Sequence, residues 1–404
     1  MEKNFAGLKV LDFSRVLVGP YLTQMMCDMG AEVIKVEKPG SGADERGMGP
    51  IFTNTKSGQP QSGYFMMLNR GKKSITLDLK NPKATQIIYD LVKETDVLVE
   101  NYAPGVMAKL NLGYDKLKEI NPGLIMCSIS TFGQEGPLAN RVGYDIVAQA
   151  MSGLMWMSGD PDRPPARSGT TIGDLNAGAH GLCAIGAALY YRSRTGKGQY
   201  IDISLRDCLT AILESAIVRF TGTNGQDRPH RSGAHHEQNI PYGVFDAGND
   251  KYIALGALNN EVWRRLCLVM GKPEMIDDPR YNSLRVRGIN KDVVNGAIEA
   301  WIQSQGDAAV ALAKLEEAKV PSAGVMDIEE VINDPQLLMR DMIVEVDDPL
   351  FGPIKLPATP MRFSETTAVN DTPPPLLGEH TLQILHNLGR TDREIEELQK
   401  EKAL

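Results

Sequence analysis

Apolar residues follow two different periods along the first 130 residues. Short apolar runs with the length of buried strands occur at 8–13, 31–37, 74–79, 97–100 and 124–130. Helical periods fill 21–29 and 82–94, and the Gly/Pro-rich stretch 38–62 predicts an ordered loop. Strands alternating with helices predict a doubly wound, mostly parallel α/β sheet, with ligands beyond the carboxyl ends of its strands.

The pattern changes twice in the rest of the chain. A long helical pattern of small and apolar residues begins at Asp174, runs to Tyr191 and predicts a helix packed on most sides. A polar stretch at 224–233 then predicts a linker into a smaller α+β domain. We therefore expect a first large-domain part at 1–223, a small domain at 224–330 and a C-terminal segment at 331–404.

Composition narrows the class of protein. The 404 residues predict two or three domains, and a net charge of −8 argues against a nucleic-acid partner. No apolar run approaches the ~20 residues of a membrane span, and no signal segment precedes the first strand, so we expect a cytoplasmic protein without a membrane partner. The five cysteines are far apart and the six histidines lack zinc spacing, which predicts reduced core thiols and no metal site.

The glycine-rich stretch 169–178 carries the strongest candidate for chemistry, because a single carboxylate, Asp174, stands there at the start of a helical pattern. A helix N-terminus favours an ionised carboxylate by roughly 0.3–1 kcal/mol. That position suits a nucleophile, but Asp is also a preferred helix cap, so both interpretations stay open. Gly169, Gly173 and Gly178 are equally consistent with an oxyanion site and with tight packing.

Two other glycine-containing turns lack the spacing of known nucleotide sites. Thr195-Gly196-Lys197 does not complete a phosphate loop and precedes a strand instead of a helix. Gly40-Ser41-Gly42 lacks the third glycine of a dinucleotide fingerprint, because Glu45 stands there. No permanently bound cofactor is therefore expected.

Six segments together resemble class III CoA-transferases, the family of formyl-CoA:oxalate and carnitine CoA-transferases. They are 10–16, 30–37, 69–74, 96–105, 144–153 and 173–174, and the likeness continues to 376–381. The resemblance implies a large domain to which 331–404 returns, a smaller domain between, and an interlocked homodimer. It also implies coenzyme A thioesters as substrates, with an acyl-CoA donor and a carboxylic acid acceptor.

By this resemblance Asp174 is the nucleophile. It attacks the donor thioester to form an aspartyl-acyl anhydride, CoA thiolate returns to give an aspartyl-CoA thioester, and the acceptor then takes the CoA. The residue type suits this chemistry, because a carboxylate with an ordinary pKa of ~3.9 is ionised at neutral pH and needs no separate base.

The resemblance also implies contacts to CoA from several loops. Its phosphates require cationic side chains, and the residues at or near the family's nucleotide positions are Lys38, Lys72, Lys73 and Lys109. Asn101 and Tyr102 flank the adenine or pantetheine. Val16 and Leu17 bring backbone near the thioester, and Tyr144 lines the same site. Taken singly, each lysine is equally consistent with a solvated surface charge, and Tyr144 with a core aromatic.

Departures from the family pattern leave other functions open. Leu17 replaces the glutamine of the oxalate enzyme, and the second domain lacks its run of glycines, so oxalate is not the expected acceptor. The stretch 228–239, with Arg228 and Arg231 beside three histidines, is either an acceptor site or a polar linker. One alternative function is an α-methylacyl-CoA racemase, which would need a histidine where Tyr144 stands. Another is a protein that binds acyl-CoA without catalysis, which would have no need of Asp174.

Overall fold

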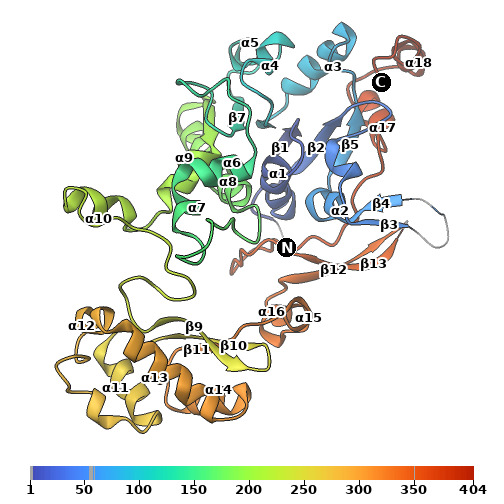
Figure 1. The fold of residues 1–404 in the computed structure, drawn as a ribbon. Coiled ribbons are helices and arrows are strands. Elements are labelled where there is room, and N and C mark those ends of the chain that lie inside the picture. Colours follow the sequence, from blue (N-terminus) through green and yellow to red (C-terminus); the bar gives the residue numbers. More distant parts are fainter. Residues whose placement is uncertain (1–2, 54–57, 59, 350) are drawn as a thin grey trace. The chain divides into compact units, whose positions relative to one another are not determined.

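A computed structural model describes residues 3–53, 58, 60–349 and 351–404 (Figure 1). Its contacts divide the chain into two units, the first made of 1–152, 169–212 and 332–404, the second of 153–168 and 213–331. The second unit thus includes 153–168 and 213–223, which we assigned to the large domain. Hydrogen bonds explain part of this difference, because Arg231 donates to the carbonyls of Trp156 and Asp160, both at 3.2 Å.

The first unit is built on six parallel strands, which confirms the predicted parallel α/β sheet. They are β1 (Lys9–Asp12), β2 (Glu32–Glu37), β5 (Lys73–Thr76), β6 (Val97–Glu100), β7 (Ile125–Ser130) and β8 (Tyr200–Ser204). The order is β5-β2-β1-β6-β7-β8, and Val10 of β1 is in register with Val33 and Val97 on its two sides. The direction of winding reverses between β1 and β6, which opens a crevice at their carboxyl ends.

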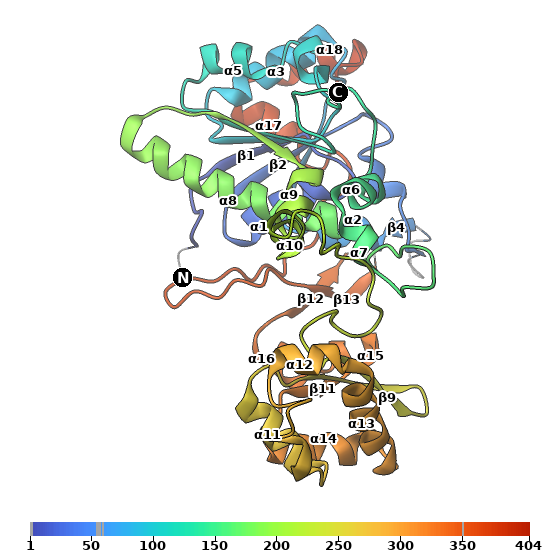
Figure 2. The same ribbon diagram turned by 60° about the vertical axis from the view of Figure 1, so that its left-hand side comes forward.

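Helices cover both faces of this sheet (Figure 2). One face carries α3 (Pro82–Val92), α4 (Val106–Lys109), α5 (Tyr114–Ile120), α17 (Thr381–Asn387) and α18 (Asp392–Lys400). The other face carries α1 (Val18–Asp28) and α8 (Ile172–Thr195). The C-terminal helices bury Ile384, Leu385, Ile395 and Leu398 in the core between the sheet and the first of these two helix layers. The last residues of the chain therefore complete the same hydrophobic core as the first strands.

Small residues let α8 approach α1 closely, whereas its opposite face is exposed. A Cβ atom at Gly178 would lie 2.9 Å from Tyr21 Cδ1 and 3.1 Å from the Val18 carbonyl oxygen. Cys183 and Tyr190 on the same helix are exposed, Tyr190 by 67%. The expectation of a helix covered on most sides is therefore wrong for this unit, and Cys183 is not a core thiol.

We predict that Gly178→Ala lowers the free energy of unfolding by about 1–3 kcal/mol, because the added methyl group forces α1 and α8 apart. Gly186→Ala on the same helix is the matched control, since no atom outside the backbone of that helix turn lies within 4 Å of the position its methyl group would take. That control should gain up to about 1 kcal/mol from helix propensity. Chemical denaturation measures both, and equal effects of the two substitutions would contradict the close approach.

The connections contain elements that the sequence pattern did not predict. The stretch 38–62 is not a plain loop: it holds the 3₁₀ helix η1 (Asp44–Gly47) and strands β3 (Ile51–Thr53) and β4 (Pro60–Ser62). Helix α1 begins at Val18 instead of Tyr21, because Pro20 in a first turn has no N–H that needs a partner. Further elements that the pattern did not predict include α2 (Gly63–Asn69), α6 (Asp145–Ser152) and α9 (Leu205–Ala211), whereas the extended segments expected after Pro335 form β12 (Ile343–Asp348) and β13 (Gly352–Pro357).

The second unit has its own sheet and core. Strands β9 (Tyr242–Gly248), β10 (Lys251–Gly256) and β11 (Ser322–Gly324) form an antiparallel sheet in the order β11-β10-β9. Its principal helices are α11 (Asn260–Val269), α13 (Lys291–Ser304) and α14 (Ala308–Glu317). They bury Trp263, Ile298 and Leu315 against Phe245 of the sheet. Within the described residues of the whole chain, no helix has both the length and the apolar character needed to cross a membrane.

Candidate active site

A cavity of about 280 Å³ lies in the first unit, where the winding of the sheet reverses. It is lined by residues of 15–18, 101–104, 129–132 and 139–144, with Asp44, Asp174 and Leu205. The first three segments follow the carboxyl ends of β1, β6 and β7. The structure therefore brings together Val16, Leu17, Asn101, Tyr102, Tyr144 and Asp174, all of which were named from the sequence.

Asp174 does not cap its helix. It is the third residue of α8, whereas the cap position is Thr171. The Thr171 side chain forms no capping hydrogen bond with the helix. The side chain that meets this helix end is Asp145, whose Oδ1 accepts the Gly173 N–H at 2.6 Å while its Oδ2 accepts from Gln149 at 2.6 Å. Asp145 thus performs the capping role that the sequence left open for Asp174.

The electrostatic environment of Asp174 opposes ionisation. Burial, and secondarily the charge of Asp145, raise its pKa to about 7. Within the described part of the chain no hydrogen bond or ion pair compensates this carboxylate. In the free protein Asp174 is therefore only partly ionised at neutral pH, because burial outweighs the helix terminus.

We predict that Asp174→Asn stabilises the protein by roughly 1–3 kcal/mol at pH 8, because it removes a partly buried and unpaired charge. The folded-state pKa of about 7 lies above the ordinary 3.8, so the folded state holds the extra proton between these values. The stability of the native protein therefore falls as the pH rises through this window, whereas that of the variant does not. Urea denaturation at pH 4 to 8 tests this, and a gap between the two proteins that is independent of pH would contradict the raised pKa.

A second cavity of about 940 Å³ adjoins the first, and the two share Arg15, Asp44 and Tyr102 in their walls. The exposed lysines that line it are Lys38, Lys80 and Lys402. Lys109 is exposed on α4, where its neighbours Val106 and Leu110 line the same cavity. The wall of this larger cavity therefore combines lysines with the carboxylates Glu37, Asp44 and Asp78, and it meets the Asp174 cavity at three shared residues.

Residues 5–381 match the family model described as CoA-transferase family III. The chain belongs to CoA-transferase family III. It is 38% identical over 394 residues to the succinyl-CoA:glutarate CoA-transferase of Mus musculus, across 96% of this chain and 87% of that relative. It is 40% identical over 361 residues to the acetyl-CoA:oxalate CoA-transferase of Acetobacter aceti, across 89% of each.

Solved structures agree with this assignment. The crystal structure of a CAIB/BAIF family protein from Brucella suis is 35% identical in sequence and gives a TM-score of 0.83. That likeness covers 96% of this chain and 100% of the other. The predicted family and the predicted kind of enzyme, a family III CoA-transferase, are thus confirmed.

Two of the four lysines named from the sequence lie away from the cavities of this CoA-transferase. Lys72 is 2% exposed, and its ammonium group lies within 3.0 Å of Asp12, Pro20 O, Thr23 and Asn69. Because an ammonium has three protons, no donor is left for a phosphate, and Lys72 is excluded from the CoA site. Lys73 begins β5, at the amino edge of the sheet, and pairs with Glu32 at 3.0 Å.

The side chain of Asn101 lines the Asp174 cavity and also bonds to the loop after β1. Its Oδ1 accepts the Arg15 N–H at 2.9 Å and its Nδ2 donates to the Arg15 carbonyl at 2.8 Å. Asn101 therefore holds the loop after β1. Tyr102 lines both cavities, whereas Asn101 lines only the cavity of Asp174.

Three groups of this CoA-transferase site were not named from the sequence. Asp145 lies beside Asp174, and Arg141 lines the cavity with an exposed guanidinium. Tyr64, on α2, has its pKa raised to about 12 by burial, with further contributions from the charges of Asp174 and Glu45. Asp145 could have been noticed beside Tyr144, but nothing in the spacing links Tyr64 to a residue 110 positions away.

Proposed function

We propose that this enzyme moves CoA from an acyl-CoA thioester to a free carboxylic acid through covalent intermediates on Asp174. The observation that carries the proposal is a partly buried carboxylate with a raised pKa and no compensating cation among the described residues, inside a cavity at the crevice of the sheet. Such a group has little structural reason to be there, because withdrawing an unpaired carboxylate from water is costly.

The proposed reaction begins when an oxygen of ionised Asp174 attacks the thioester carbonyl. The C–S bond breaks, CoA leaves as thiolate, and an aspartyl-acyl anhydride remains. The thiolate then attacks the aspartyl carbonyl, which releases the donor acid and leaves an aspartyl-CoA thioester. The acceptor carboxylate repeats these steps in reverse order, so the product thioester leaves with Asp174 free again. Each exchange conserves the energy of the thioester, provided that water is excluded.

The two adjoining cavities support a proposed path for CoA. The nucleotide end occupies the cavity of about 940 Å³, where Lys38 and Lys80 in its wall and Lys109 beside it offer charge to the phosphates. The pantetheine arm passes Arg15 and Tyr102, which belong to both walls, and the thioester reaches the cavity of Asp174. Val16, Leu17 and Tyr144 surround the thioester end in this proposal.

We propose a dicarboxylic acid as the acceptor, with succinyl-CoA as a donor to test first. Relatives named for glutarate and oxalate support an acid with two carboxylates. In the Asp174 cavity Arg141 is an exposed cation, and its Cζ lies 5.7 Å from the centre of the Phe132 ring. A guanidinium in this wall suits the second carboxylate of the acceptor while the first one reacts.

The remaining features of the proposal follow the family resemblance. We propose a cytoplasmic homodimer that uses CoA thioesters as substrates and holds no permanent cofactor. Five free cysteines are consistent with a reducing compartment. Helix α10 (Ala216–Gly222) has no buried residue and exposes Ile217 by 50% and Val218 by 70%, which is typical of a surface covered by a partner.

We predict that hydroxylamine, added during turnover of succinyl-CoA, converts Asp174 to a hydroxamate, because it traps either the anhydride or the aspartyl-CoA thioester. Mass spectrometry of the peptide containing Asp174 measures the modification. Asp174→Asn should show neither the hydroxamate nor transfer while it still binds CoA. An unmodified peptide with every donor, together with deuterium exchange at the substrate α-carbon, would instead support a racemase. Neither labelling nor exchange would support a protein that only binds acyl-CoA.

We predict that Arg141→Gln raises the KM for a dicarboxylic acceptor such as glutarate by about tenfold, because one charge-assisted contact is lost. The KM for a monocarboxylic acceptor such as butyrate should change less than about twofold. Arg163→Gln is the matched control, since Arg163 is 80% exposed and belongs to the second unit. An equal rise in KM for both kinds of acceptor would contradict the proposed role of Arg141.

A further inference from the structure

Val16 has a backbone conformation that its side chain disfavours. Its φ is 68°, in the left-handed region, where a β-branched residue is an outlier. Such a conformation costs on the order of 1–3 kcal/mol and persists only where the surroundings enforce it. Val16 also lines the Asp174 cavity, so the strain is located at the proposed site of reaction.

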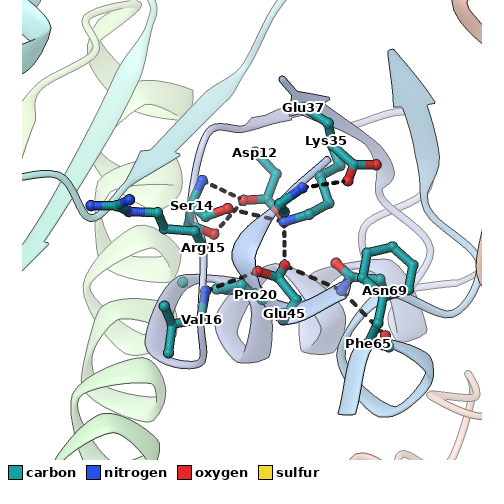
Figure 3. Close-up of polar contacts among 12 residues, drawn as sticks. Asp12, Ser14, Arg15, Val16, Pro20, Lys35, Glu37, Glu45, Phe65 and Asn69 are labelled. Carbon is teal, nitrogen blue, oxygen red and sulfur yellow. Dashed lines mark hydrogen bonds and ion pairs between the residues drawn. The ribbon is translucent and has the colours of Figure 1, made fainter. Parts of the chain in front are cut away.

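Glu45 is the group that meets this strained residue. Its Oε2 accepts the Val16 N–H at 3.0 Å, and the side chain is completely buried (Figure 3). Its Oε1 forms an ion pair of 2.8 Å with Lys35, a side chain that is also completely buried. A carboxylate whose charge is neutralised on one oxygen can remain buried while the other oxygen holds a backbone N–H.

The residues on either side of Val16 are held by hydrogen bonds in which Glu45 takes no part. Lys35 Nζ donates to the Ser14 carbonyl at 2.9 Å, and Asn101 bonds to both backbone groups of Arg15. On the other side, the Leu17 carbonyl accepts the Tyr21 N–H at 2.8 Å. The Val16 carbonyl cannot accept a helical bond from position 20, because Pro20 has no N–H. Glu45 therefore controls the one residue of this loop whose conformation is unfavourable.

Glu45 itself is held from outside this loop. It belongs to η1, and the neighbouring Arg46 forms two hydrogen bonds of 2.7 Å with Glu37, at the end of β2. Arg46 also covers the Phe65 ring at 3.7 Å. The η1 segment thus brings a carboxylate to the loop after β1, and Figure 3 shows this carboxylate in contact with both Lys35 and Val16.

We propose that Glu45 is a positioning residue that keeps Val16 left-handed and so aims the peptide group between Val16 and Leu17 at the cavity of Asp174. Leu17 is the cap residue of α1, so the orientation of this peptide decides which backbone groups face the proposed thioester. This inference rests on the proposed function for its effect on rate. It extends that function to a residue that lines neither cavity.

The test uses Glu45→Gln and Glu45→Asp in the full-length enzyme. Aspartate keeps the charge beside Lys35 but shortens the reach to Val16, so it separates positioning from the ion pair. Each variant should lose about 10- to 100-fold in kcat, with the KM for acyl-CoA within about threefold of the native value. Retention of the native kcat by Glu45→Asp would overturn the proposal. That variant also decides the matter if Glu45→Gln does not fold.

A second substitution distinguishes positioning from a general structural role. Glycine adopts a positive φ without strain, so Val16→Gly combined with Glu45→Asp should restore kcat to within about fivefold of the native value. Lys319→Gly is the matched control, because Lys319 is also left-handed, with φ 55°, but lies in the second unit. It should restore nothing. A folded double variant of residues 16 and 45 that stays as slow as Glu45→Asp alone would overturn the proposal.

A crystal structure of Glu45→Asp separates this inference from the proposed function. We expect Val16 at a negative φ in that variant, whether or not the native enzyme transfers CoA. A native enzyme inactive with every donor and acceptor, together with this backbone change, would reject the proposed function alone. An unchanged left-handed Val16 in the variant would reject the role of Glu45 alone.

Discussion

Two buried lysines support the loop on which the site depends. Lys72 pairs with Asp12 at 3.0 Å and Lys35 with Glu45 at 2.8 Å, with all four side chains completely buried. Burial would raise the pKa of Asp12, but Lys72 and Lys35 overcome it and hold that pKa below its usual range. Asp12 therefore stays ionised, and the loop after β1 is bonded to buried groups that cannot easily move.

The carboxylate of Asp174 contrasts with this cluster. The carboxylates under the loop have cations within 3.0 Å, whereas the described residues offer Asp174 only a neighbouring like charge from Asp145. The same protein thus satisfies buried charges where they support structure and leaves one unsatisfied in a cavity. That difference distinguishes the structural carboxylates from the proposed nucleophile, and the residue type alone does not reveal it.

The topology explains why the loop after β1 and Asp174 meet at one cavity. Parallel strands place the loops after β1, β6 and β7 at one edge of the sheet, and the reversal of winding opens the crevice between the first two. Asp174 reaches this edge from the start of α8, which the small residue Gly178 brings against α1. The cavity, the backbone around it and the proposed nucleophile are therefore supplied by segments that are far apart in sequence.

The sequence by itself determined the parallel α/β sheet, most of its strands and the family, because hydrophobic periodicity and local motifs report local structure directly. It also singled out Asp174, Val16 and Tyr144, which the fold gathers around one cavity. Only the tertiary structure decided that Lys72 is buried beside Asp12, that Asn101 bonds to the backbone of the loop after β1 and that Glu45 bonds to Val16. A residue type shows which bonds a side chain is able to make, but burial and long-range contacts decide which ones it makes and whether its charge remains.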